Sequence, residues 1–359
     1  MTEVLVVGGG PAGAAAALRL AQGGAEVTLV EREPAAREKV CGEFLGPDAA
    51  ALLEGLGLSL PCLGAVPIGA ARLASGAREA AWALPFGAWS LPRAVLDEAL
   101  LDLAAGAGAR VLRGAVVLAA GREGAEWCAR LAGGTTLHGA ALVLATGKHE
   151  LRGHARAKRG GSVGLKLPLR LAAPMPAEVV LLPFDGGYAG LQPRPEGGAN
   201  LCAALHAVES ADAPSLLARV SAGSDRAGAL LRGAEPLLPR PMAVAGVPYG
   251  FRHRDGAAPE PGLYRVGDQF AVVPSLAGDG VAMALAGGEE VARAILSGRP
   301  AGEFHAALNR RLDRPMRWAG LIARGLDRAP GSLALAARIA PALARLAAAR
   351  TRLPGFSAA

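Results

Sequence analysis

Glycines and one acid recur at a regular spacing near the start of the chain. Gly8, Gly10 and Gly13 follow a short run of β-branched residues, and Glu31 ends a second such run. Gly8 permits a tight turn, Gly10 lets a pyrophosphate approach the backbone, and Gly13 lets the next helix pack closely on the sheet. We therefore predict a dinucleotide-binding unit of strand, glycine turn, helix, strand and acid within residues 3–31.

The same residues define the nucleotide. Pro11 and Ala12 complete the glycine turn, and the helix expected over Ala14–Ala21 offers unpaired N–H groups and a partial positive charge to phosphates at its N-terminus. The carboxylate of Glu31 can accept hydrogen bonds from both hydroxyls of a ribose, and it would repel a 2′-phosphate. The bound nucleotide should therefore end in plain adenosine.

Composition sets wider bounds on the protein. The chain has 359 residues, a formal net charge of +7 and 52% hydrophobic residues, which is ample for one large domain or two intertwined ones. Its arginines are scattered and are not interleaved with aromatics, so nucleic-acid binding is not expected. The four cysteines, Cys41, Cys62, Cys128 and Cys202, lack metal-ligand spacing, so we expect no metal site and reduced thiols.

The chain enters its first strand without a basic leader, and it has no uncharged apolar run of about 18 residues. We therefore expect neither a signal peptide nor a transmembrane helix, and a cytoplasmic location.

Periodicity predicts strands and helices in an alternating order. Strands are expected within 66–82 and at 110–119, 127–131, 135–137, 141–147 with a glycine turn at its end, 163–171, 178–183, 188–192, 200–207 and 263–266. Helices are expected at 48–53 with Asp48 as the cap, at 94–104, 215–232 and 281–296, and from 304 onward with a break near 330–331.

This order predicts an α/β protein with a Rossmann-like nucleotide-binding domain, an inserted sheet-rich substrate domain and a helical C-terminal tail. The nucleotide domain comprises 1–160 and 255–300, with 62–90 joining the sheet of the insert. The insert comprises 161–254 and the tail 301–359.

A second motif resembles a known family. Gly267-Asp268, Pro274 and Gly278-Asp279-Gly280, followed by a helix from Val281, look like the second FAD signature of the flavin monooxygenase and geranylgeranyl reductase superfamily. The resemblance implies FAD, with Asp268 on the ribityl hydroxyls and the helix N-terminus at the pyrimidine end of the flavin.

The segment Lys39-Val40-Cys41-Gly42-Glu43-Phe44-Leu45 resembles a loop that passes near the flavin in geranylgeranyl reductases. The resemblance makes Cys41, beside Lys39, a candidate catalytic thiol; the alternative is that Cys41 only packs in the loop. Arg93 looks like the start of a flavin-contacting helix. Further flavin contacts implied by the resemblance are Arg32, Arg37, Gly42, Val117, Ala145 and Gly147.

The segment Gly187-Tyr188-Ala189-Gly190-Leu191-Gln192-Pro193 is similar to the substrate-domain motif Tyr-x-Trp-x-Phe-Pro of the same reductases. Tyr188 is therefore the second catalytic candidate. Gly190 and Gln192 replace the two large aromatics, which predicts a wider or differently shaped pocket. Thr146 also replaces the aspartate usual in monooxygenases, which leaves the electron donor open between NADH and NADPH.

These features predict an FAD-dependent oxidoreductase that acts on an apolar small molecule. Reduced flavin can transfer hydride to an activated double bond, or it can react with dioxygen and hydroxylate. The sequence favours monooxygenase or oxidase chemistry, with reduction of a C=C bond in an isoprenoid or polyketide lipid as the alternative. A nicotinamide-dependent dehydrogenase and a non-catalytic flavin-binding module are further alternatives, and the oligomeric state stays open.

The tail raises one question of partners. Arg317, Arg324, Arg338, Arg345 and Arg352 share one heptad phase, with apolar residues between them. Such a pattern could lie on an anionic membrane surface as a peripheral contact. The alternative is that the apolar residues pack on the flavin domain and the arginines face water.

Overall fold

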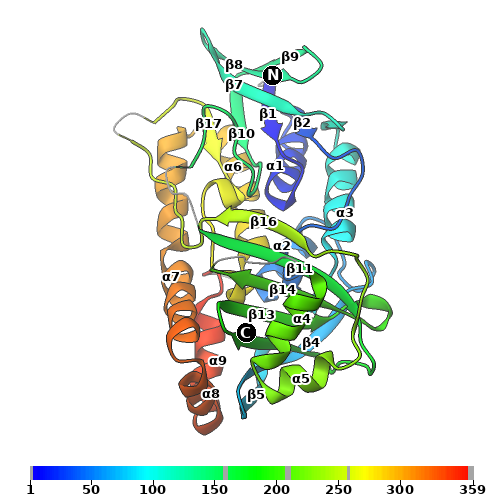
Figure 1. Cartoon of the computed structure of the whole chain (residues 1–359). Coiled ribbons are helices and arrows are strands. Elements are labelled where there is room, and N and C mark those ends of the chain that lie inside the picture. The colour runs from blue at the N-terminus through cyan, green and yellow to red at the C-terminus, as the bar shows by residue number, and fades with distance from the viewer. Residues whose placement is uncertain (1–2, 157–160, 207–211, 257–258, 355–359) are drawn as a thin grey trace.

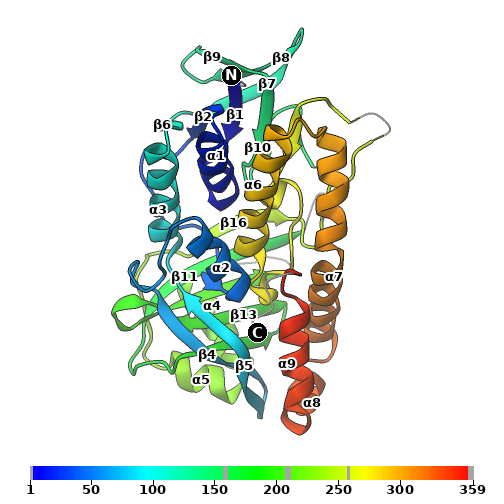
Figure 2. The same cartoon turned by 180° about the vertical axis from the view of Figure 1, so that it is seen from behind.

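The computed structural model of the chain describes residues 3–156, 161–206, 212–256 and 259–354. Ala207, the last residue of one predicted strand, and residues 355–359 of the predicted tail lie outside the described residues. The described residues form a parallel sheet, a large mixed sheet, a small antiparallel sheet and a helical C-terminal region (Figures 1 and 2). This arrangement confirms the predicted α/β class with its inserted sheet and helical tail.

The parallel sheet has the strand order β17-β10-β1-β2-β6. Its strands are β1 (Glu3–Val7), β2 (Glu26–Glu31), β6 (Arg110–Arg113), β10 (Ala141–Leu144) and β17 (Leu263–Arg265). Successive side chains of a strand point to opposite faces, so β1 serves two cores. Val4 and Val6 are buried in the core shared with the helices, whereas Leu5 and Val7 pack on the side of Trp127.

The two faces of this sheet are covered differently. The helices are α1 (Pro11–Gln22), α3 (Arg93–Gly106) and α6 (Gly280–Leu296). The opposite face meets the small sheet of β7 (Val117–Glu123), β8 (Glu126–Leu131) and β9 (Thr136–Gly139). The carboxyl ends of β1, β2 and β10 all remain open toward the middle of the molecule, where ligands of such sheets bind.

The large sheet has the order β15-β11-β14-β13-β12-β4-β5-β3, with β16 paired to β11. Its strands are β3 (Phe44–Leu45), β4 (Val66–Ser75), β5 (Arg78–Ser90), β11 (Ser162–Arg170), β12 (Glu178–Phe184), β13 (Gly187–Pro193), β14 (Gly198–Leu205), β15 (Glu235–Pro236) and β16 (Met242–Val247). Parallel pairing of β4 with β12 draws residues 66–90 into this sheet.

Helices α4 (Ala213–Ala222) and α5 (Asp225–Leu231) cover one face of the large sheet. On β13, Ala189 and Leu191 point into that helical core. Tyr188, Gly190 and Gln192 alternate with them and face the other way, into a cavity. One face of the large sheet therefore packs against α4 and α5, and the opposite face of β13 lines the cavity.

The remaining helices are α2 (Pro47–Gly55), α7 (Ala301–Arg328), α8 (Pro330–Ile339) and α9 (Pro341–Arg350), with short 3₁₀ turns η1 (Pro195–Gly197), η2 (Gly267–Gln269) and η3 (Ser275–Ala277). Leu326 of α7 and Ala334 of α8 pack against Leu73 of β4. Within the described residues, no single helix is long and apolar enough to span a membrane. The pair α8–α9 meets that test only jointly, and it is bent by 112°.

Four local predictions were wrong. The expected strand 110–119 is two strands in different sheets, because Gly114 turns the chain with φ +68°. The expected helix 215–232 is interrupted after Gly223, where Ser224 accepts a hydrogen bond from Ala227 N–H and begins a new helix. Asp48 does not cap its helix, whose N-cap is Gly46. Instead, the Asp48 carboxylate accepts a hydrogen bond from the N–H of Leu353, 3.1 Å away.

The heptad of the tail is the fourth error. Arg317 and Arg324 lie on α7, Arg338 on α8 and Arg345 on α9, and the 112° bend between the last two helices removes any common face. Arg352 follows α9, is only 9% exposed, and pairs with Asp279 at 2.6 Å. The five arginines therefore do not form one stripe.

Candidate functional site

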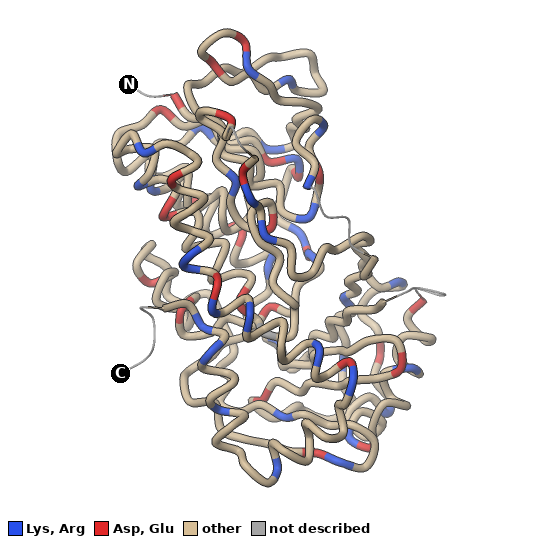
Figure 3. The backbone as a smooth tube through the Cα atoms, turned by 90° about the vertical axis from the view of Figure 1, so that its left-hand side faces the viewer, with Lys and Arg blue, Asp and Glu red and all other residues tan. Residues whose placement is uncertain are grey.

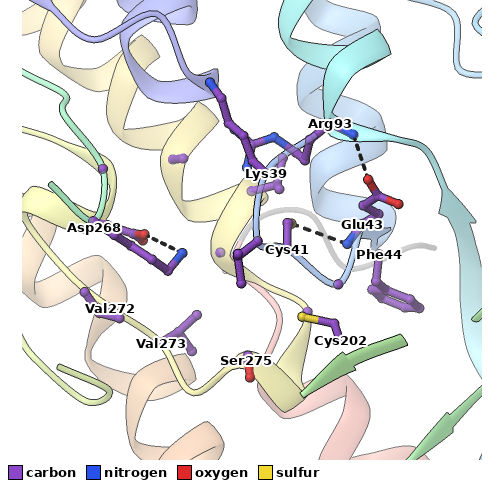
Figure 4. A pocket seen from close by; sticks show the side chains of 18 of the residues that line it. Lys39, Cys41, Glu43, Phe44, Arg93, Cys202, Asp268, Val272, Val273 and Ser275 are labelled. Carbon is purple, nitrogen blue, oxygen red and sulfur yellow. Dashed lines mark hydrogen bonds and ion pairs between the residues drawn. The ribbon is translucent and has the colours of Figure 1, made fainter. Parts of the chain in front are cut away.

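A cavity of about 1050 Å³ runs between the parallel sheet and the large sheet. We call one end the polar half: it is lined by the glycine turn, by residues 30–43 and Arg93, and by residues 145–151 and 267–281. We call the other end the apolar half: it is lined by β4, β5, β12 and β13 and by α7–α9. Figure 4 shows the polar half with Lys39, Cys41 and Arg93 facing Asp268 across the opening.

The glycine turn brings backbone close to the cavity. A Cβ atom on Gly13 would lie 1.9 Å from the carbonyl oxygen of Gly8, and one on Gly8 would lie 2.3 Å from that of Ala145. These contacts explain why β1, α1 and β10 can converge only with glycine at both positions. A Cβ on Gly10, in contrast, would meet only Arg93 Nη2, at 3.7 Å, and would project into the open cavity.

Glu31 closes the end of the polar half. Its side chain is buried, and its two oxygens accept hydrogen bonds from Gly9 N–H at 2.7 Å and Glu33 N–H at 3.0 Å. A carboxylate offers about four acceptor sites, so both oxygens keep capacity for ribose hydroxyls. The geometry suits the role predicted for Glu31.

Arg93 lies at the centre of the polar half. Its guanidinium binds Asp97 through two hydrogen bonds of 2.8 and 2.9 Å. Burial opposes its charge, but attraction to Asp97 and to Cys41 outweighs burial and raises the pKa of Arg93. Lys39 pairs with the same Asp97 at 2.9 Å. Arg93 and Lys39 therefore share the carboxylate of Asp97, and the cations attracted to the Cys41 thiol are Arg93 and Lys148.

The loop that carries Cys41 is held by contacts of Glu43 and Asn200. Glu43 has φ +64°, the only positive φ among the described residues other than glycines. Its carboxylate accepts a hydrogen bond from Arg93 N–H and pairs with the fully buried ammonium of Lys166. Burial raises the pKa of Glu43, and Lys166 opposes that rise. Asn200 donates to the carbonyl oxygens of Cys41 and Gly42, each at 3.0 Å.

These contacts fix Cys41 against the cavity wall rather than leave it on a free loop. The Cys41 sulfur accepts the N–H of Glu43 at 3.3 Å (Figure 4). Cys202, on β14 in the same wall, is half-buried, and removal of its thiol from water raises the pKa of that thiol to about 12. Neither role predicted for Cys41, packing or catalysis, is tested by this geometry.

The second motif completes the polar half. Gly267 has φ +57°, and a Cβ there would lie 3.1 Å from Ala12 of α1. Asp268 pairs with Lys148 at 3.0 Å, and attraction to Asp268 raises the pKa of Lys148. Gly278 takes the left-handed conformation just before α6. Among the described residues, neither α1 nor α6 has a side-chain cap or an acid in its first turn that would fill its free N–H groups.

These observations fit FAD. Two uncapped helix N-termini, an open approach at Gly10, a buried ribose acceptor and the cations Arg93 and Lys148 match a long dianionic dinucleotide. The predicted contacts that line the cavity are Gly8, Gly10, Pro11, Ala12, Glu31, Arg32, Arg37, Cys41, Gly42, Arg93, Val117, Ala145, Gly147, Gly267, Asp268, Gly278, Gly280 and Val281. Gly13 and Pro274 lie behind this lining, where Gly13 allows the close packing already described.

Two predicted cations have partners outside the nucleotide. Arg37 pairs with Glu33 at 2.6 Å, and Arg32 pairs with the same carboxylate at 3.0 Å. Both arginines line the cavity with their side chains directed to Glu33, and their contact with the flavin stays a prediction.

Sequence reasoning missed four side chains of the site. Lys148 stands directly after Gly147 at the carboxyl end of β10, a position that could have drawn attention. Lys166 alternates with the buried Leu165 and Leu167, which is the pattern of a solvent-facing residue. Tyr249 and Ser275 gave no signal, because only the tertiary structure brings them to Tyr188.

Tyr188, Ser275 and Tyr249 form a chain of hydroxyls in the cavity wall. The hydroxyls of Tyr188 and Ser275 are 2.6 Å apart, and Tyr249 also hydrogen-bonds Ser275. Burial, together with the neighbouring Tyr249, raises the pKa of Tyr188. The N–H of Leu276 donates to the Tyr188 hydroxyl at 3.3 Å. The phenols thus remain protonated at neutral pH.

The apolar half continues beyond this chain. Its lining includes Leu73, Trp82, Leu84, Phe86, Val179, Leu181, Ile322, Leu326, Leu333, Ala337 and Leu343. Gly190 lies in the same wall, and a Cβ there would meet no atom within 4 Å. Gln192 also lines the cavity, and its side-chain amide donates a hydrogen bond to the Ser90 hydroxyl at 2.7 Å. The space expected from the missing aromatics is therefore present.

Comparisons with known proteins agree with this site. Residues 1–135 match the family described as FAD binding domain. The chain is 28% identical over 335 residues to menaquinone reductase of Mycolicibacterium smegmatis, covering 82% of this chain and 76% of that protein. The fold resembles the flavin-dependent brominase Bmp2, with a TM-score of 0.77, 16% identity, and coverage of 99% of this chain and 96% of the other.

A second solved structure is similar in fold. It is a geranylgeranyl bacteriochlorophyll reductase-like protein from Thermoplasma acidophilum, with a TM-score of 0.73, 20% identity, and coverage of 93% of this chain and 89% of the other. The fold and the site define a flavoprotein that binds FAD. With the match of residues 1–135 to the FAD binding domain and the similarity to a menaquinone reductase, the chain is an FAD-dependent oxidoreductase.

Proposed function

We propose that this enzyme reduces a carbon–carbon double bond in a lipophilic substrate, such as the unsaturated side chain of a prenylated quinone. The observation that carries the proposal is the apolar half of the cavity, which extends from the flavin site to the C-terminal helices. A long apolar chain would bury its surface there, which is favourable by roughly 25 cal/mol per Å². The match to a menaquinone reductase over most of both chains supports the same class of substrate.

Bound FAD, once reduced, supplies a hydride to one carbon of the double bond. The chain has to place that carbon at the opening between Cys41 and Asp268 and to hold a proton for the other carbon. Tyr188 is our candidate for holding it, because its hydroxyl is kept protonated and is linked through Ser275 to Tyr249. The apolar walls keep water from the reacting carbons.

The predicted binding residues have separate tasks in this proposal. Glu31 would bind the adenosine ribose, the start of α1 with Arg37 the pyrophosphate, Arg93 the flavin, and Asp268 the ribityl chain. An external hydride donor of the NADH or NADPH type would have to reduce the cofactor again after each turnover. In the net reaction, the double bond gains one hydride from this donor and one proton.

Anaerobic single turnover tests the proposal against oxygenation, the chemistry that the sequence favours. The holoprotein is photoreduced without oxygen and mixed with a menaquinone that has an unsaturated side chain. We expect flavin reoxidation and, by mass spectrometry, a product that gains two hydrogens in its side chain. Turnover only after oxygen is admitted, with a product that gains an oxygen atom, would replace reduction with oxygenation.

A further inference from the structure

Apolar side chains are exposed where α8 meets α9. Ile339 ends α8 and is 73% exposed, and Leu343 and Leu346 of α9 are 61% and 44% exposed. Leu321 of α7 is 53% exposed. We call Ile339, Leu343 and Leu346 the apolar corner. Exposed apolar side chains that gather in one short segment, here residues 339–346, are candidates for a binding surface, whereas single ones need no explanation.

Basic residues prevail on the helices that carry the apolar corner. Residues 314–350 contain a single acid, Asp327, together with seven arginines. The arginines are Arg314, Arg317, Arg324, Arg328, Arg338, Arg345 and Arg350. Figure 3, which faces the α7 side, shows basic positions recurring along these helices. Arg338 and Arg345 are exposed beside the apolar corner, one on each of its helices.

The apolar corner also lies at the rim of the cavity. Leu343 is largely exposed and yet lines the cavity, and Ala344 and Ala347 continue the lining from the same helix. The inner side of α8 is held in place, because Leu333 and Ala334 pack with Leu73 and Trp82. The outer side of the two helices is therefore a rigid apolar edge between the cavity and the surroundings.

We propose that the apolar corner docks on an anionic lipid surface and that the lipophilic substrate enters the cavity there. The combination of exposed leucine and isoleucine with flanking arginines matches the surface of helices that lie in a membrane interface. The 112° bend places α8 and α9 as a corner that can dip into the interface, rather than as a span. The substrate part rests on the proposed function, whereas the docking itself does not.

Co-sedimentation of the FAD-loaded protein with vesicles tests the docking without any turnover. The vesicles contain phosphatidylcholine with phosphatidylglycerol, or phosphatidylcholine alone. We expect binding to the anionic vesicles that weakens with salt and is much lower on phosphatidylcholine. The double variant Ile339→Asp/Leu343→Asp should lose about tenfold or more of this binding. The substitutions Arg338→Gln and Arg345→Gln should each weaken it about fivefold.

The control is Leu118→Asp, the same kind of apolar-to-acid change at one 49% exposed leucine of β7, at the opposite end of the molecule (Figure 1). This variant should bind vesicles as the wild type does, and all variants should keep their flavin absorbance. Equal binding by the Ile339→Asp/Leu343→Asp variant, or no wild-type binding at low salt, would overturn the proposal. So would a wild-type dimer in solution that the same double variant dissociates, because a second copy would then cover the corner.

Discussion

The polar half of the cavity is formed mainly by backbone groups, whereas the apolar half is formed by side chains. The polar half is mostly backbone and short motifs: glycines at Gly8, Gly10 and Gly278 and the free N–H groups of α1 and α6. The apolar half is side chains from four strands and three helices that are far apart in the sequence. A cofactor common to many enzymes is thus bound by local geometry, whereas substrate shape is set by tertiary packing that can vary freely.

The Cys41 loop lies where the two halves of the cavity meet, and the ion pair between Lys166 and Glu43 supports it. Removing that ion pair tests whether the two halves depend on each other. Lys166→Met would leave the Glu43 carboxylate buried beside a loop with φ +64°. Removing one partner of a buried ion pair costs about 3–5 kcal/mol. We expect urea unfolding of the holoprotein at pH 7 to show a loss of free energy of unfolding in that range.

The double variant Lys166→Met/Glu43→Gln is the matched control, because it removes both charges of this pair, while Glu38, the other partner of Lys166, keeps its ion pair with Arg194. It should recover much of the stability that the single variant loses. A loss below about 1 kcal/mol in the single variant would mean that the loop does not depend on this ion pair.

Gly13→Ala tests the polar half alone. The added Cβ would lie 1.9 Å from the Gly8 carbonyl oxygen, so β1 and α1 must move apart. Overpacking of this kind costs about 1–3 kcal/mol, occasionally more. We expect a lower melting temperature and loss of bound FAD, measured by absorbance per protein. Gly106→Ala is the control, since a Cβ there meets no atom within 4 Å; equal effects in the two variants would count against close packing as the cause.

Asp268→Ala has a smaller and more specific effect. The carboxylate pairs with Lys148 and faces the cavity, so its loss removes a charged hydrogen-bond acceptor from the flavin side. A hydrogen bond to a charged group is worth about 1.5–3 kcal/mol, so FAD affinity should fall at least about tenfold. Fluorescence titration of the apoprotein with FAD measures this. Asp185→Ala, in the exposed turn between β12 and β13, should leave affinity unchanged. An unchanged affinity of Asp268→Ala for FAD would mean that the flavin does not bind beside η2.

The same contrast explains what the sequence could predict. Gly8 to Glu31 form a contiguous unit whose spacing fixes its own geometry, so the nucleotide fold was predictable. Lys166 was not, because its strand alternates normally and only the approach of residues 38–43 buries its ammonium. Tyr249 and Ser275 meet Tyr188 through long-range packing that no local pattern encodes. The sequence did not predict the chain breaks at Gly114 and Gly223. A glycine within an apolar run can end a strand or helix or lie inside it, and the pattern alone does not distinguish the two cases.

Gly190→Trp sharpens the comparison from the apolar side. The residue pairs with Leu181 and Cys202 across the sheet, and its missing side chain would point into open cavity. Tryptophan suits a strand better than glycine does, so the melting temperature and FAD content should stay the same or rise slightly. Turnover of a long prenylated substrate should fall more than about tenfold, because its chain can no longer pass the new indole. Gly121→Trp on β7, also without an atom within 4 Å, should leave turnover unchanged. Full turnover of long substrates by Gly190→Trp would mean that the substrate does not pass β13. Loss of FAD from this variant would mean that a change in the apolar half also affects the polar half.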